Sequence, residues 1–114
     1  ISLIMIAIQN LLTNAVRYSG PGSPIEVETG TQDGMVFVRV RDYGAGISEE
    51  DLPYIFKRFY KADKSRNSQG FGLGLPLTMK IAQKHGGTVL VQSRQGEGST
   101  FTLLLPQNEW EVQS

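Results

Sequence analysis

The sequence predicts an α+β fold, a two-layer α/β sandwich in which a mixed, mostly antiparallel sheet is covered on one face by helices. Two long stretches have the apolar spacing of amphipathic helices, and two others each contain a pair of β-rich runs joined by a turn. Strands that occur in hairpins between helices favour this layered arrangement. With 114 residues, 39% of them hydrophobic, we expect a single domain over residues 1–114.

The first helix is predicted from Leu3 to Tyr18, and the glycines and prolines from Gly20 to Pro24 end it. Its apolar residues recur at helical spacing: Ile4, Ile8, Leu11, Leu12 and Ala15.

A first hairpin is predicted to pair Ile25–Thr29 with Met35–Val40, because Asp33-Gly34 between the two runs is a strong turn signal. Ser48 then precedes Asp51 by three residues, which resembles an N-cap with an acidic first turn, so a short helix is expected there. Residues 61–69 contain one apolar side chain and are predicted to form a mobile loop.

The second long helix is predicted between the glycines that precede Pro76 and the stop signal Gly86-Gly87. A second hairpin follows, with strands Thr88–Ser93 and Ser99–Leu105.

The composition excludes several classes of function. Lysine plus arginine and aspartate plus glutamate are balanced at 11 each, so we expect no nucleic-acid partner and no membrane contact by this segment. There are no cysteines, which excludes disulfides and thiolate metal sites. The chain begins with Ile1 rather than methionine and its apolar start is too short to cross a bilayer, so we expect an N-terminally truncated fragment.

Asn10, Asn14 and Arg17 project from one face of the first predicted helix. That face offers amide oxygens for a hard cation and a guanidinium for phosphate. A solvated polar stripe on an amphipathic helix is the alternative.

Asp42 ends a predicted strand and is followed by Gly44, Gly46 and Ile47. A carboxylate backed by glycines can meet a flat heterocycle at close range because glycine has no Cβ. An ordinary Asp/Gly turn is the alternative.

The run from Gly70 to Leu75, GFGLGL, leads directly into the second helix, where backbone N–H groups can hold phosphate oxygens. The run follows a loop rather than a strand, which argues against a Rossmann fingerprint, and no P-loop motif is present. His85 is best explained as a helix C-cap rather than a phosphoacceptor. The role of Trp110 stays open.

Taken in order, these motifs resemble the ATP-binding catalytic domain of sensor histidine kinases, of the Bergerat or GHKL type, over nearly the whole chain. NLLTNAVRYS resembles the N box, DYGAGI the first glycine box, LPYIFKRFY the F box and GFGLGL the second glycine box. KHGG and GEGSTFTLLLP resemble the closing segments of the family.

The resemblance implies a role for each matching residue. Asn14 would ligate Mg²⁺, and Asn10 stands where related ATPases carry a glutamate general base. Because an amide cannot deprotonate water, Asn10 favours phosphoryl transfer over hydrolysis. Asp42 would accept a hydrogen bond from the adenine amine, and Thr100 would reach the adenine through water.

Residues 61–69 would form the ATP lid, whose basic side chains either screen phosphate or are simply solvated. Asn10, Asn14 and Arg17 would be the catalytic residues. The full ATP-binding set implied by the resemblance is Asn10, Asn14, Arg17, Tyr18, Asp42, Gly44, Gly46, Ile47, Tyr60, Lys61, Gly70, Phe71, Gly72, Leu73, Gly74, Leu75 and Thr100.

The resemblance further implies transfer of the γ-phosphate of Mg-ATP to a histidine on a separate helical dimerisation domain, with a response regulator downstream. The parent is expected to be an inner-membrane sensor with this domain in the cytoplasm. An ATP hydrolase of the same superfamily and a non-catalytic nucleotide-binding regulatory module are the alternatives. The family usually begins with a strand and an aspartate ahead of the first helix, and this sequence starts later, so we expect an uncovered sheet edge.

Overall fold

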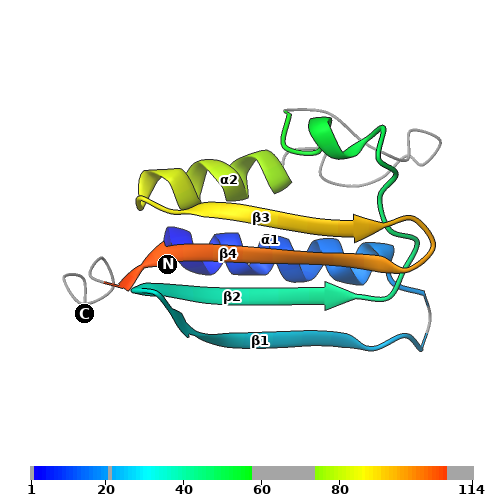
Figure 1. Cartoon of the computed structure of the whole chain (residues 1–114), viewed down its shortest axis with the longest axis horizontal. Helices are drawn as coiled ribbons and strands as arrows, with labels where there is room; N and C mark the ends of the chain where they lie inside the picture. The colour runs from blue at the N-terminus through cyan, green and yellow to red at the C-terminus, as the bar shows by residue number, and fades with distance from the viewer. Residues whose placement is uncertain (1, 21, 58–73, 108–114) are drawn as a thin grey trace.

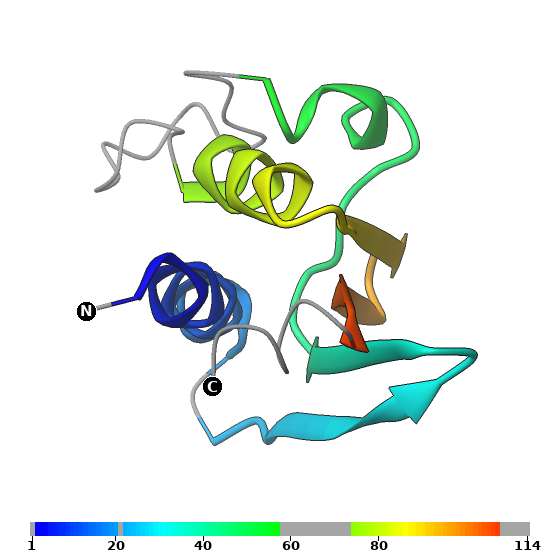
Figure 2. The same ribbon diagram turned by 90° about the vertical axis from the view of Figure 1, so that its left-hand side faces the viewer.

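The computed structural model describes residues 2–20, 22–57 and 74–107. Within them, a four-stranded sheet is packed against two α-helices that lie on one of its faces (Figure 1; Figure 2). The predicted α+β two-layer sandwich is therefore confirmed. The predicted lid, residues 61–69, and Trp110 lie outside the described residues.

Helix α1 spans Leu3–Tyr18, as predicted. Ser2 caps its N-terminus by accepting a hydrogen bond from the Met5 amide at 3.2 Å. The helix buries a stripe of apolar side chains against the sheet, made of Ile4, Ala7, Leu11 and Ala15.

The four strands are β1 (Ile25–Gln32), β2 (Met35–Asp42), β3 (Thr88–Arg94) and β4 (Gly98–Pro106). Their order in the sheet is β1-β2-β4-β3, and every pairing is antiparallel in the part of the chain that the structure describes. The sequence predicted a mixed, mostly antiparallel sheet, and these four strands form two hairpins joined through an antiparallel β2–β4 pair. Each strand is one to three residues longer than its sequence pattern predicts.

The expected short helix after Ser48 is a single 3-10 turn, η1 (Leu52–Tyr54). Ser48 receives a hydrogen bond from the Asp51 amide at 3.2 Å and donates one to the Asp51 carboxylate at 3.0 Å.

Helix α2 spans Gly74–Lys84 and ends in a Schellman motif. The Gly87 amide bonds the Ala82 carbonyl at 2.8 Å and the Gly86 amide bonds the Gln83 carbonyl at 3.0 Å, while Gly86 has a φ of 82°. Neither helix in the described ranges is long and apolar enough to span a membrane.

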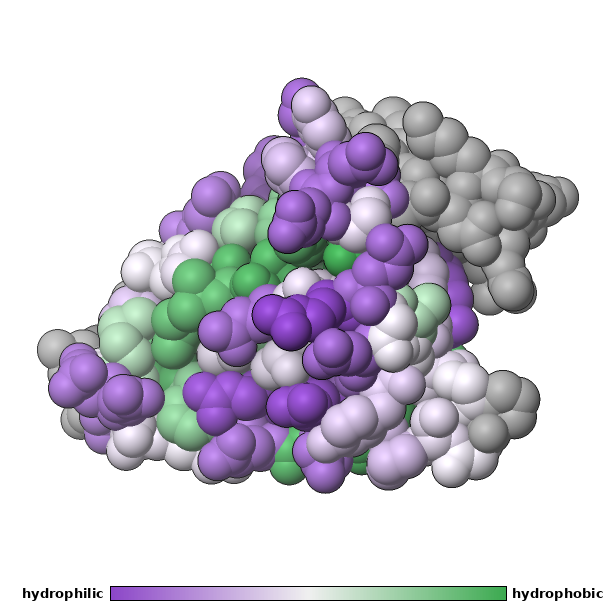
Figure 3. Space-filling view, turned by 45° about the vertical axis from the view of Figure 1, so that its right-hand side comes forward, coloured by the Kyte–Doolittle hydropathy of each residue, from purple (hydrophilic) through white to green (hydrophobic). Residues whose placement is uncertain are grey.

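The core lies between the helices and the sheet. Its fully buried members come from α1, α2 and the helix-facing positions of the strands, among them Leu11, Val40, Ile81, Ala82, Phe101, Leu103 and Leu105. The opposite face of the sheet carries both apolar and polar side chains. Figure 3 shows hydrophobic residues next to hydrophilic ones on the side turned toward the viewer. Arg39 there bonds Glu28 at 2.8 Å.

Candidate functional site

Asp42, the last residue of β2, is a buried carboxylate with one hydrogen bond. Its side chain is on the helix-facing side and the residue is only 2% exposed. Oδ1 accepts the Gly44 N–H at 2.9 Å, and among the described residues no second donor and no cation bonds this carboxylate. Buried carboxylates are normally satisfied by several donors or a positive charge. Asp42 therefore has acceptor capacity for a donor that comes from outside the described chain.

The loop after Asp42 follows a path that only glycine permits at two positions. A Cβ on Gly44 would overlap the Tyr18 carbonyl oxygen at the end of α1. Gly46 has a φ of 74°, and a Cβ there would overlap the Arg94 carbonyl at the end of β3. These glycines are thus needed to seat the loop between α1 and the β3–β4 hairpin. The sequence predicted that these two glycines contact the nucleotide. The structure shows that they are also needed for packing, whether or not they contact a ligand.

A hydroxyl on β3 fastens the same loop to the second hairpin. The Ser93 Oγ accepts the Ile47 N–H at 2.7 Å and donates to the Gly98 carbonyl at 3.0 Å. It also lies 2.8 Å from the Ser99 Oγ. The Gly96 N–H adds a backbone bond to the Ala45 carbonyl at 2.6 Å. The loop therefore has a fixed position relative to β3 and β4.

Sequence reasoning chose Thr100 as the hydroxyl that reaches the adenine, but the register does not bring Thr100 to Asp42. Asp42 pairs with Ser99, whereas Thr100 pairs with Arg41 and Gln92. Because neighbouring residues of a strand point to opposite faces, Thr100 lies on the face away from the helices. Ser99 is the hydroxyl on Asp42's side, and it is buried. The alternation of strand residues could have favoured Ser99 over Thr100 only if the β2–β4 register had been known.

The predicted polar face of α1 meets the start of α2. The Asn10 Nδ2 donates to the Gly74 carbonyl at 3.3 Å, and the Thr78 hydroxyl donates to the same carbonyl at 2.8 Å. Asn14, one turn further along α1, is half-buried on the same side of the helix. Arg17 is exposed in the last turn of α1.

Tyr18 closes α1 beside Gly44, so the N-box helix and the first glycine loop are in direct contact. Gly74 and Leu75 begin α2, and Leu75 packs against the core. The structure thus gathers the described members of the predicted set around the end of β2, the end of α1 and the start of α2, with Thr100 on the other face. The remaining members lie outside the described residues: Tyr60, Lys61, Gly70, Phe71, Gly72 and Leu73.

The described residues contain no cluster of three or more histidine, cysteine, aspartate or glutamate side chains that could hold a metal by themselves. Mg²⁺ does not require such a cluster, because it usually keeps several waters and takes one or two protein oxygens together with substrate phosphates. A half-buried amide such as Asn14 fits that smaller contribution.

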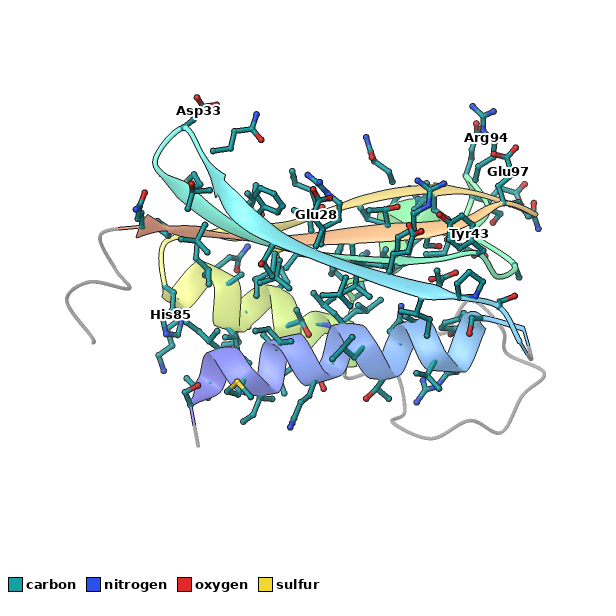
Figure 4. All side chains as sticks on the ribbon, turned by 90° about the horizontal axis from the view of Figure 1, so that it is seen from below. Glu28, Asp33, Tyr43, His85, Arg94 and Glu97 are labelled. Atoms are coloured by element: carbon teal, nitrogen blue, oxygen red, sulfur yellow. The ribbon has the colours of Figure 1, made fainter. Side chains whose placement is uncertain are left out.

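His85 lies far from this region. It follows α2 and its Nδ1 is 2.9 Å from the Ile81 carbonyl. In Figure 4 it lies at the opposite end of the molecule from Tyr43, which follows Asp42. The prediction of a helix-end role is confirmed by this contact.

Comparison with known proteins assigns the class. Residues 1–109 match the family described as histidine kinase-, DNA gyrase B- and HSP90-like ATPases, and the chain belongs to this family. Its relatives are sensor histidine kinases. The chain is 46% identical over 95 residues to sensor histidine kinase YkoH of Bacillus subtilis. The matched segment covers 82% of this chain and 20% of YkoH.

Two solved structures have the same fold. The mycobacterial sensor histidine kinase MprB has a TM-score of 0.79 and 30% identity, over 89% of this chain and 70% of that one. Full-length ShkA in complex with AMPPNP has a TM-score of 0.80 and 27% identity, over 91% of this chain and 21% of ShkA. The chain spans about a fifth to a quarter of the length of the curated relatives it matches.

Proposed function

We propose that this chain binds Mg-ATP and directs its γ-phosphate to a histidine on a separate helical dimerisation domain of the same protein, in a two-component pathway that ends on a response regulator. The observation that carries the proposal is Asp42, a buried carboxylate with one backbone donor, at the start of the loop that packs between α1 and the β3–β4 hairpin. An adenine amine is the kind of donor it lacks. The AMPPNP complex of ShkA, which shares the fold, supports a nucleotide as the ligand.

Asn10 supports transfer rather than hydrolysis. Its side chain donates a hydrogen to the Gly74 carbonyl, which an ionised glutamate or aspartate cannot do. In this chain, position 10 therefore holds α1 to the start of α2 and supplies no base for water.

The remaining chemistry is positioning and charge neutralisation, as phosphoryl transfer generally requires. Asn14 would hold Mg²⁺, and the bound ion would supply neutralisation of the phosphate charge. Arg17 would face the phosphates from the last turn of α1, and the N-terminus of α2 would favour their negative charge. The parent is expected to be an inner-membrane sensor that carries this domain on the cytoplasmic side.

The test is phosphotransfer in a mixture of this chain, the dimerisation domain of its parent, Mg²⁺ and ATP labelled on the γ-phosphate. Acid-labile label on the histidine of the dimerisation domain is expected, with a much lower rate for Asn14→Ala. Thr31→Ala, an exposed change on β1, is the matched control and should keep the wild-type rate.

Two outcomes would contradict the proposal. Rapid phosphate release by the chain alone would indicate an ATP hydrolase. Nucleotide binding without label on any histidine would indicate a regulatory module.

A further inference from the structure

Ser93 joins two segments that are far apart in the sequence. Its hydroxyl lies within hydrogen-bonding distance of the Ile47 N–H in the loop after Asp42, and of both the Gly98 carbonyl and the Ser99 hydroxyl on β4. The residue is half-buried on β3, at the end of the sheet where Asp42 lies. This one small side chain therefore makes three polar contacts, one with the loop and two with β4.

The donors and acceptors around Ser93 determine the direction of each bond. A serine hydroxyl has one hydrogen to give. The Gly98 carbonyl can only accept and the Ile47 N–H can only donate, so Ser93 gives its hydrogen to Gly98 and receives one from Ile47. The Ser99 hydroxyl must then donate to Ser93. Having given its only hydrogen to Ser93, the Ser99 oxygen can only accept further hydrogen bonds, through its two lone pairs.

Ser99 and Asp42 are directly paired on the helix-facing side of the sheet, and both are buried. Side chains directly opposite each other in such a pair are close neighbours. A ligand group placed against both of them meets only acceptors, which suits an amino group and disfavours a carbonyl oxygen.

We infer that Ser93 is a positioning residue that sets the purine preference of the site by holding the Ser99 hydroxyl as an acceptor beside Asp42. The inference rests on the proposed nucleotide-binding function. Without Ser93, the Ser99 hydroxyl is free to rotate and offer its hydrogen to the 6-oxo group of guanine.

The experiment is calorimetric titration of the 114-residue chain with AMPPNP and GMPPNP, each with Mg²⁺. Ser93→Ala should weaken AMPPNP binding by about tenfold and lower the AMPPNP-to-GMPPNP affinity ratio by a similar factor, since one hydrogen bond is worth roughly one such factor. Ser93→Thr keeps the hydroxyl and should restore the ratio. Ser99→Ala should lower the ratio, and the double variant should lower it no further, because both changes act through one pair.

Thr88→Ala is the matched control. Thr88 is on the same strand at the other end, where, among the described residues, its hydroxyl bonds only the Met79 sulfur, at 3.7 Å. Both affinities should therefore stay at the wild-type values.

The inference is overturned if Ser93→Ala weakens both nucleotides equally, since that would mean a purely structural role. It is also overturned if Ser99→Ala keeps the wild-type ratio, a readout that holds even when Ser93→Ala does not fold. Failure of the proposed function has a different signature: the wild-type chain would bind neither nucleotide, and the Ser93 inference would fall with it.

Discussion

The hydrogen bonds of Asp42 favour a role in binding over a role in stability. A carboxylate used for stability would be expected to gather several donors or a cation, and Asp42 has one backbone donor among the described residues. Its neighbour Tyr43 is different: its hydroxyl donates to the Glu26 carboxylate at 2.8 Å on the outer side of the sheet. These adjacent residues at the end of β2 therefore differ: Asp42 has acceptor capacity left for the proposed ligand, whereas Tyr43 anchors the end of β2 to β1.

Tyr43 gives a pH-dependent prediction. The hydrogen bond to Glu26 is the main cause that raises the pKa of Tyr43 above its ordinary value, with burial a smaller one and Arg41 opposing. A raised pKa means that the anchoring is present below the ordinary tyrosine pKa of about 10 and is lost as pH rises through the higher folded value. The absorbance titration of the wild type minus that of Tyr43→Phe should show this shift.

The control for Tyr43 is Glu26→Gln, which removes the carboxylate and should bring the titration back toward the ordinary value. A Tyr43 titration at or below the ordinary tyrosine pKa in the wild type would contradict the contact.

At the level of elements, the sequence predicts both helices, including the two ends of α1, and both hairpins, but it predicts strands that are too short. β1 continues through Gly30 to Gln32 although glycine is a poor strand former. The turn explains this: Asp33 and Gly34 both have positive φ, 54° and 78°, and a tight two-residue turn pairs Gln32 directly with Met35. Pairing with β2 therefore extends β1, and the strand propensity of single residues does not take such pairing into account.

Contacts between elements are even harder to predict from the sequence than the lengths of the strands. The bond from Asn10 to the Gly74 carbonyl joins residues 64 positions apart, and the choice between Ser99 and Thr100 depends on the β2–β4 register. The order of the motifs predicts which residues belong to the candidate site, whereas the face on which each residue lies and its contacts can be known only from the fold.

Gly44 tests how the loop and α1 fit together. Gly44→Ala places a methyl group against the Tyr18 carbonyl, so the free energy of unfolding should fall by about 1–3 kcal/mol, as overpacking typically costs. Nucleotide affinity should fall with it, because the loop that follows Asp42 must move. Urea unfolding followed by fluorescence measures the first effect and calorimetry the second.

Gly20→Ala is the matched control for Gly44. Its Cβ would meet only the Ser23 Oγ at an ordinary 3.7 Å, so a change within about 0.5 kcal/mol is expected. Equal stability of the two alanine variants would mean that the loop does not pack against α1 as described.

At the scale of the whole molecule, the described parts of the site meet at one end of the sandwich. α1 ends there, β2 ends there and β4 begins there, and the loop after Asp42 passes between them (Figure 1). One face of the sheet is used to hold the helices, while the site is built from the ends of the elements.

The most direct test of the account is calorimetric titration of AMPPNP with Mg²⁺ into the wild-type chain and Asp42→Asn. The asparagine keeps an oxygen for the Gly44 N–H but replaces the charged acceptor, so affinity should fall by about a hundredfold, the upper range for a hydrogen bond to a charged group. The unfolding midpoint should not fall, because the change removes a buried charge without a cationic partner among the described residues. Unchanged affinity in Asp42→Asn would contradict the assignment of this site to the nucleotide.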